Sequence, residues 1–159
     1  MNMKSPPGIT VFDVADWFLA RAKAEGKPLK HMKLQKLVYF AHGWYCAYRE
    51  YSEPLFADSI LVWRRGVLVK DLYEKYKSFG ENPIDIEGLQ SPDLHVSVTE
   101  ILEAVWKAYS HLSNSILDMA IERHSAWREA QCSSEWDAVM SLESIQNTFK
   151  EMIALYEHA

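Results

Sequence analysis

One stretch of the chain, residues 34–48, constrains the fold more than any other, because its apolar side chains cover more than one face of a helix. Apolar residues recur there at i, i+3, i+4 and i+7 without a break. They are Leu34, Leu37, Val38, Ala41, Trp44, Tyr45 and Tyr48. Earlier and later helices need a surface to pack against, so we predict that this helix is central, with Leu37, Ala41 and Trp44 buried.

A glycine inside this segment indicates a close contact. Gly43 stands within the expected helix, where glycine costs on the order of 1 kcal/mol relative to alanine. We therefore predict that another backbone packs closely against the helix at this point.

Amphipathic segments on both sides of the central one predict further helices. Several follow a Thr or Ser that can cap the first turn, and two end at glycine. The expected helices run from Thr10, with Asp13 completing a capping box, to Gly26; from Lys70 to Gly80; from Val98 to Tyr109; from Ser113 or Ser115 to Ile121; and from Ser141 to Tyr156, with a short segment capped by Ser134 and Asp137.

The predicted fold is mainly α, a compact single-domain helical bundle over residues 1–159. Ser59 to Val69 is rich in β-branched and aromatic residues and forms one short β-hairpin or extended element. We expect residues 1–8 to be flexible. Residues 81–97 contain two prolines and a glycine among acids, which predicts an exposed connection.

Composition and charge exclude several classes of protein. With 159 residues, 48% hydrophobic and 25% charged, the chain is of globular type. Its formal net charge of −5 disfavours general binding to nucleic acid. Cys46 and Cys132 are far apart and form no metal or disulfide pattern. No signal peptide or membrane span is expected, so we predict a cytoplasmic location and no membrane partner.

Catalytic and cofactor motifs are missing from the pattern. No two histidines have metal-ligand spacing and no glycine-rich phosphate loop occurs, so we predict no metal and no organic cofactor. Asp118 and Glu122 stand at i, i+4 with His124 close by, which leaves acid–base catalysis open beside an ordinary solvated helix face. His42 lies one turn from Cys46, and we interpret this pair as buried structure.

Two basic clusters leave open whether the chain contacts a protein or a nucleic acid. The first includes Lys27, Lys30, His31, Lys33 and Lys36, and the second includes Arg64, Arg65 and Lys70. Trp63 directly precedes Arg64, and Trp and Arg are residues that often dominate the free energy of protein binding. We favour a protein interface at Trp63, Arg64 and Arg65, with a core position as the alternative for Trp63.

A series of specific motifs runs along the chain. The first is the string Lys33 to Trp44, KLQKLVYFAHGW. It is followed by Pro54-Leu55-Phe56, Trp63, Gly66-Val67, Tyr73 and Phe79-Gly80, and later by His124 and Trp127 within residues 117–130. In this order the motifs resemble the Panacea domain family, which includes the SocA-like antitoxins and the phage-associated protein GepA, and the resemblance spans most of residues 10–130.

The chain departs from this family at two places. Arg65-Gly66-Val67 stands where the family usually has an aromatic residue, Gly and Pro. Arg123 and Ala126 replace the usual Thr before the later His and the usual Pro before the later Trp. These departures affect any role carried over to those positions, and they leave the helical framework intact.

The resemblance implies an antitoxin without enzymatic activity that binds a cognate protein toxin. For SocA-like members it also implies an adaptor that hands the toxin to a AAA+ protease. A nucleic-acid-binding regulator of a phage or mobile element is the alternative function, and an enzyme using Asp118, Glu122 and His124 is a third hypothesis. The expected partner-binding residues are Trp63, Arg64, Arg65, Tyr73, His124 and Trp127.

Overall fold

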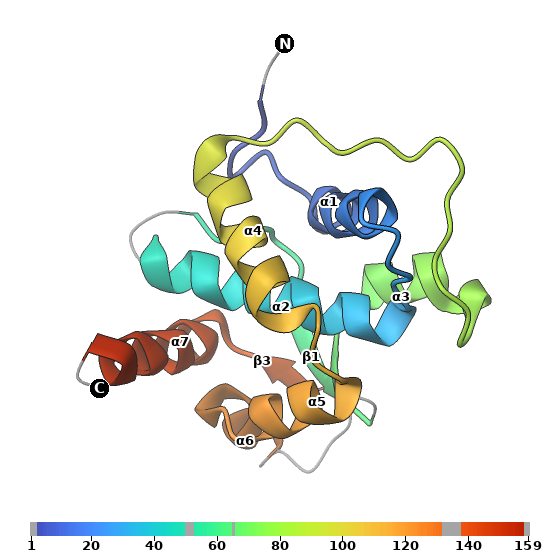
Figure 1. The fold of residues 1–159 in the computed structure, drawn as a ribbon. Helices are drawn as coiled ribbons and strands as arrows, with labels where there is room; N and C mark the ends of the chain where they lie inside the picture. The colour runs from blue at the N-terminus through green and yellow to red at the C-terminus, as the bar shows by residue number, and fades with distance from the viewer. Residues whose placement is uncertain (1–2, 50–52, 65, 132–137, 158–159) are drawn as a thin grey trace.

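A long helix, α2 (His31–Tyr48), runs through the middle of the computed structural model, which describes residues 3–49, 53–64, 66–131 and 138–157. It packs against α1, α4, α7 and β2 (Figure 1). Fourteen of its residues are buried, on all sides of the helix, as its continuous apolar spacing predicts. Leu37 and Ala41 are fully buried, whereas Trp44 is only half-buried. The prediction that Trp44 is buried is therefore wrong.

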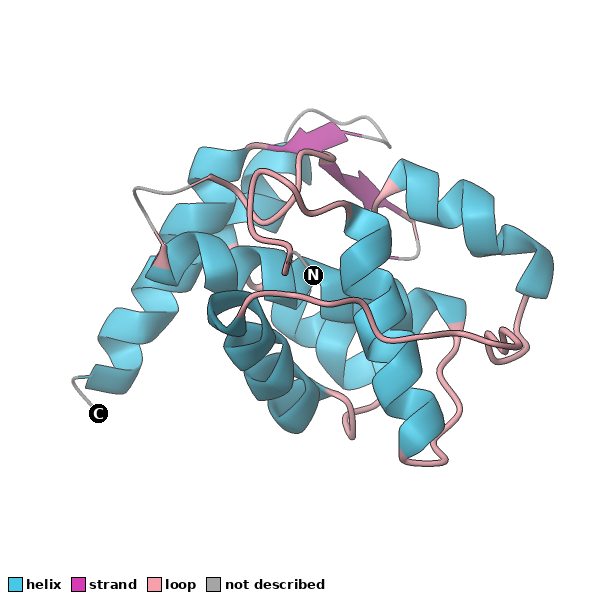
Figure 2. Cartoon of the chain, turned by 90° about the horizontal axis from the view of Figure 1, so that it is seen from above, coloured by secondary structure: helices cyan, strands magenta, loops and turns pink. Residues whose placement is uncertain are grey.

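Helix α7 (Leu142–Glu157) makes the most extensive contact with α2. Its Phe149 is fully buried, and a Cβ atom at Gly43 would overlap the Phe149 ring. Gly43 therefore permits a close approach, as predicted, but the group that approaches is an aromatic side chain rather than a backbone. The C-terminal end of α7 projects from the body of the molecule (Figure 2).

Helix α1 (Val11–Ala24) begins with the predicted capping box. Asp13 N donates to Thr10 Oγ1, and Thr10 N donates to the Asp13 carboxylate. After α1 the chain turns at Gly26, with a φ of +65°. Helix α4 (Val96–Tyr109) packs beside α1, with its first turn capped by His95.

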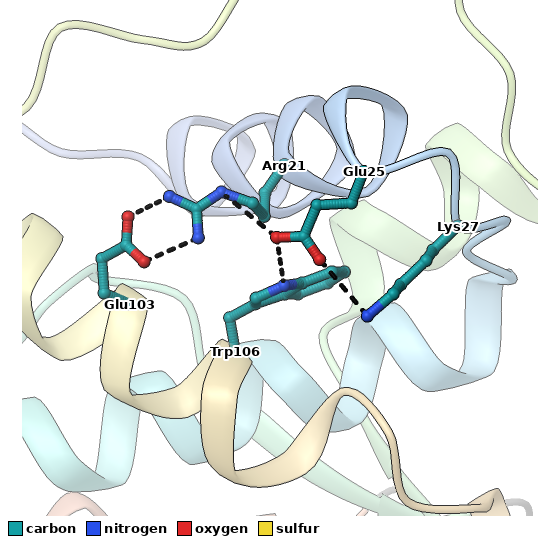
Figure 3. A network of polar contacts seen from close by, with 5 residues as sticks. All are labelled: Arg21, Glu25, Lys27, Glu103 and Trp106. Atoms are coloured by element: carbon teal, nitrogen blue, oxygen red, sulfur yellow. Dashed lines mark hydrogen bonds and ion pairs between the residues drawn. The ribbon is translucent and has the colours of Figure 1, made fainter.

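Polar contacts join α1 to α4 on the surface of the molecule (Figure 3). Arg21 donates two hydrogen bonds to the carboxylate of Glu103. Glu25 accepts a hydrogen bond of 3.0 Å from the Trp106 indole and pairs with Lys27 at 3.4 Å. All the ionised side chains of this group are at least a quarter exposed.

The predicted connection between the third and fourth helices runs over α1 (Figure 1). It follows α3 (Lys70–Tyr76) and the 3-10 turn η1 (Lys77–Phe79), and it ends where α4 begins. Most of its residues are exposed. Ile84 and Leu94 are buried and anchor it, and Leu94 lies opposite Lys4 in an isolated β-bridge.

The predicted hairpin forms two strands of a three-stranded antiparallel sheet. β1 (Ile60–Trp63) pairs with β2 (Gly66–Leu68), with Trp63 opposite Gly66. The third strand, β3 (Ala138–Met140), pairs with the other edge of β1 and was not predicted. Three residues are too few to show a strand period, and the pairing joins distant parts of the chain.

Two shorter helices complete the fold. α5 (Asn114–Glu122) begins after Ser113, whose Oγ accepts from Ile116 N at 3.2 Å, so Ser113 rather than Ser115 is the cap. α6 (Ser125–Gln131) follows directly. Ser141 caps α7, as predicted. The predicted segment with Ser134 and Asp137 lies outside the described residues.

The described residues thus form a mainly α fold with one small sheet, as predicted. No helix in these parts of the chain is long and apolar enough to cross a membrane.

Candidate functional site

The turn between β1 and β2 is the first element of the candidate site. Trp63, at the end of β1, is half-buried and packs edge-on against Tyr73 of α3, with ring centroids 5.1 Å apart. Arg64 follows and is exposed. Gly66 has a φ of +115°, a conformation that favours glycine. Arg65 lies outside the described residues.

An ion pair lies beneath this turn. Lys36 of α2 is buried, with its side chain 2% exposed, and its Nζ stands 3.3 Å from Oδ1 of Asp118 on α5. That oxygen accepts no aligned hydrogen bond from the described residues, so the contact is electrostatic. A Cβ atom at Gly66 would stand 3.1 Å from the same oxygen. The hairpin therefore approaches the ion pair closely only because residue 66 is glycine.

A small cavity connects the turn to α5 and α6. It measures about 70 Å³ and is lined by Arg64, Gly66, Asp118, Glu122 and Trp127, together with Ile121. We call the Arg64, Gly66, Asp118 and Glu122 group the hairpin surface. It brings an arginine of the turn beside two acids of α5, although 54 positions separate Arg64 from Asp118 in the sequence.

The structure places the other predicted partner-binding residues differently. His124 and Trp127 are 8% and 5% exposed, so both side chains are part of the core. His124 Nδ1 lies 2.8 Å from the Tyr39 hydroxyl, and burial lowers the pKa of His124 to about 4. The partner-binding role of the predicted set stays a prediction, and Arg64, at the hairpin, is the exposed member among those that the structure describes.

The residues considered for catalysis do not share one site. Asp118 faces Lys36, the exposed Glu122 lines the cavity, and His124 contacts Tyr39 in the core. Cys46 is buried, and burial raises the pKa of its thiol to about 11, which disfavours the reactive thiolate. Across the described residues, no group of three or more His, Cys, Asp or Glu could hold a metal ion.

The first basic cluster does not form a continuous surface. His31 and Lys36 are 4% and 1% exposed, because they lie on inward faces of α2. Lys33 donates a hydrogen bond of 2.7 Å to the Ser110 carbonyl. Burial, followed by the charge of Lys36, lowers the pKa of Lys33.

An exposed aromatic groove is a feature that the sequence analysis did not find. It lies between α2, α4 and α7, measures about 250 Å³, and is lined by Trp44, Tyr48, Tyr109 and Tyr156 with small residues of α4. Trp44 Nε1 donates to the Tyr109 hydroxyl at 3.0 Å, while Tyr156 is 76% exposed. We call these four residues the aromatic groove. The i, i+4 spacing of Trp44 and Tyr48 is the sequence signal from which this groove could have been predicted.

Comparison with known families identifies the chain. The family model described as "Antitoxin SocA-like, Panacea domain" matches residues 34–128, more than half of the chain. The match begins in α2 and ends in α6, so it includes the whole hairpin surface. Neither the curated proteins nor the solved structures gave a significant match. The chain belongs to the family of SocA-like antitoxins with a Panacea domain, and at the level of that family its role is of the toxin–antitoxin type.

Proposed function

We propose that this protein neutralises a cognate protein toxin by direct binding, and that it catalyses no reaction. The observation that carries the proposal is the hairpin surface, where Arg64 meets Asp118 and Glu122 around a cavity lined by Trp127. Charged groups of both signs on one rigid surface fix the orientation of a partner and exclude wrong partners. Arginine adds a planar group with several directional donors.

The packing on both sides of the turn supports a binding role. Gly66 lies close to Asp118, and Trp63 packs on Tyr73. A preorganised surface loses less conformational entropy when it binds, so more of the contact energy is available as affinity.

The separate placement of the acid–base candidates supports a role without catalysis. A general base must lie within hydrogen-bond reach of its target, and cooperating groups must converge on one point. Asp118 and Glu122 line one small cavity, but His124 lies apart from them, in contact with Tyr39 in the core.

Two observations favour a protein over a nucleic acid as the partner. The net charge is −5, and two members of the first basic cluster, His31 and Lys36, are buried. Binding to a phosphate backbone depends on exposed cations and weakens steeply with salt. Retention on DNA that falls with salt would support the alternative, a regulator of a phage or mobile element.

The finer proposal, an adaptor that delivers the toxin to a AAA+ protease, requires two binding surfaces. The aromatic groove has no residue in common with the hairpin surface, and its exposed Tyr48 and Tyr156 are of a residue type enriched at interfaces. The two surfaces could therefore be occupied at once. Loss of toxin turnover in cells that lack the protease, with toxin binding intact, would support the adaptor.

The direct test takes as candidate partner the product of a reading frame that lies beside this gene and is toxic when expressed alone. We expect Arg64→Ala, alone and with Arg65→Ala, to weaken the complex by about 2 kcal/mol, roughly 30-fold in Kd, measured by calorimetry. The melting temperature should hardly change, because exposed substitutions usually stay within about 0.5 kcal/mol of neutral. Lys107→Ala, which removes an exposed cation from α4, is the control.

The same variants test the proposal in cells. Arg64→Ala should protect cells from the toxin less well than Lys107→Ala. If the variant at Arg64 folds and protects as well as the parent, the hairpin surface is not the interface. If no candidate toxin binds the unaltered protein, direct neutralisation is wrong.

A further inference from the structure

A second small cavity lies where the segment leading into β1 meets the beginning of α7. It measures about 130 Å³ and is bounded by α2, by residues 54–60 and by residues 139–145. None of its lining residues belongs to the hairpin surface or to the aromatic groove. We call it the His42 cavity, after the α2 residue that lines it.

His42 has an incomplete set of hydrogen bonds. Its side chain is buried, 3% exposed, and Nδ1 has no hydrogen-bond partner among the described residues. The ring packs against Phe56, with centroids 4.2 Å apart. A buried polar atom without a partner costs free energy. An occupant of the cavity that carries a polar group would recover part of this cost.

The state of the imidazole indicates what kind of group fits. Burial lowers the pKa of His42 to about 4, so the ring is neutral near pH 7. A neutral imidazole has one nitrogen that accepts a hydrogen bond. A ligand that donates hydrogen bonds is therefore complementary to it.

The charge at the cavity has one sign. Among the described residues that line it, Asp58 is the only charged one, and none is Lys or Arg. Burial raises the pKa of Asp58, and the charge of Asp71, whose side chain is hydrogen bonded to Asp58, adds to the shift. A cation beside Asp58 would relieve the repulsion between these two acids.

Apolar side chains form part of the exposed lining of the cavity. Val139 and Leu142 line it and are 57% and 43% exposed, and Ser59 and Ser141 are also exposed there. An occupant with an aliphatic portion can pack against Val139 and Leu142 while its polar head lies near Asp58 and His42. Lysine and arginine side chains have this arrangement, with an apolar stem and a charged head.

We propose that the His42 cavity receives the stem and cationic head of a lysine or arginine side chain from the bound toxin. The stem lies against Phe56, Val139 and Leu142, and the head donates hydrogen bonds to the Asp58 carboxylate and to the free nitrogen of His42. The assignment of the occupant to the toxin rests on the proposed function. The preference of the cavity for an alkylated cation is independent of it.

The first experiment tests the cavity without a toxin. n-Butylammonium and n-propylguanidinium reproduce the two side chains, and n-butanol is an uncharged compound of similar shape. We expect both cations to shift the NMR signals of the His42 ring in a saturable manner and to bind at least about tenfold more tightly than n-butanol, because hydrogen bonds from a charged donor are stronger than those from a neutral one. The tighter cation indicates which side chain fits. Equal binding of n-butanol, or no saturation, overturns the proposal.

The second experiment separates the cavity from the toxin interaction. Asp58→Asn should weaken n-butylammonium and toxin binding by about tenfold each, whereas Asp93→Asn, which removes an exposed carboxylate elsewhere, should change neither. If Asp58→Asn weakens amine binding but leaves toxin binding unchanged, the toxin is not the occupant and the proposal is wrong. If no toxin binds the unaltered protein, the proposed function fails, and with it the assignment of the occupant, while the amine titration still decides the preference of the cavity.

Discussion

Two sets of polar contacts join helices in this protein, and they differ in the exposure of the cation. Between α1 and α4, Arg21 pairs with Glu103 and Glu25 accepts from Trp106, and these ionised groups are partly in water (Figure 3). Between α2 and α5, Lys36 pairs with Asp118; the Lys36 side chain is almost completely buried beneath the hairpin, whereas Asp118 is 35% exposed.

The difference separates the net stability that an ion pair contributes from its ability to favour one arrangement of the helices. Exposed pairs contribute about 0–1 kcal/mol, because water already solvates both charges well. A buried pair has a large desolvation cost and adds little net stability, but removal of one partner leaves an uncompensated charge. The Lys36–Asp118 pair therefore makes any arrangement of α5 that separates the two groups unfavourable, whereas the α1–α4 contacts tolerate rearrangement.

The largest effect should follow from breaking the buried pair. We expect Asp118→Ala to lower the free energy of unfolding by about 3 kcal/mol, measured by denaturant titration. The double variant Lys36→Met with Asp118→Leu should recover most of this loss, because it removes both charges. A loss below about 1 kcal/mol for Asp118→Ala would show that the buried pair behaves like an exposed one.

The buried histidines of the same interior should make stability depend on pH. Burial lowers the pKa of His42 and of His124 to about 4, below the value of about 6.5 expected in the unfolded chain. The stabilisation is fully present above pH 6.5 and is lost as the pH falls toward 4, by up to about 3 kcal/mol for each histidine.

Unfolding measured at several pH values tests this expectation. His124→Gln should reduce the loss of stability between pH 6.5 and 4. His111→Gln is the matched control, since His111 is exposed. An unchanged slope for His124→Gln would show that protonation of His124 does not contribute to the acid sensitivity.

The exposed network should give the smallest effect. Glu103→Gln is expected to lower the free energy of unfolding by about 0.5 kcal/mol, and high salt should abolish the difference from the parent protein. The hydrogen bonds from Arg21 lower the pKa of Glu103. This contribution is present above the pKa of glutamate in the unfolded chain and is lost as the pH falls through the lower pKa in the folded state. A loss above 2 kcal/mol that salt does not change would contradict the comparison.

Local signals predicted most of the helical framework. The capping box at Thr10, the caps at Ser113 and Ser141 and the apolar spacing of α2 each depend on residues a few positions apart. β3 could not be predicted in this way, because its pairing partner β1 is distant in the sequence and its own length shows no period.

The candidate site was predicted only in part, for the same reason. Trp63 and Arg64 could be identified from their residue types. The acids beside Arg64 could not, because they come from α5, which is distant in the sequence. Lys36 was assigned to a basic cluster, although most of its neighbours in α2, among them Gln35, Leu37 and Phe40, are buried. A lysine within a helix that is apolar all round must itself be buried, and that argument predicts a carboxylate partner.

The contact of Phe149 with Gly43 also shows that the core of the domain extends beyond the matched region. Gly43 lies within the matched region 34–128, whereas Phe149 and β3 lie beyond it. A fragment limited to the matched region would have an open hole at the centre of α2 and an unpaired edge on β1. During synthesis, the core contacts of α2 and β1 are therefore complete only after residues 138–149 have been added to the chain.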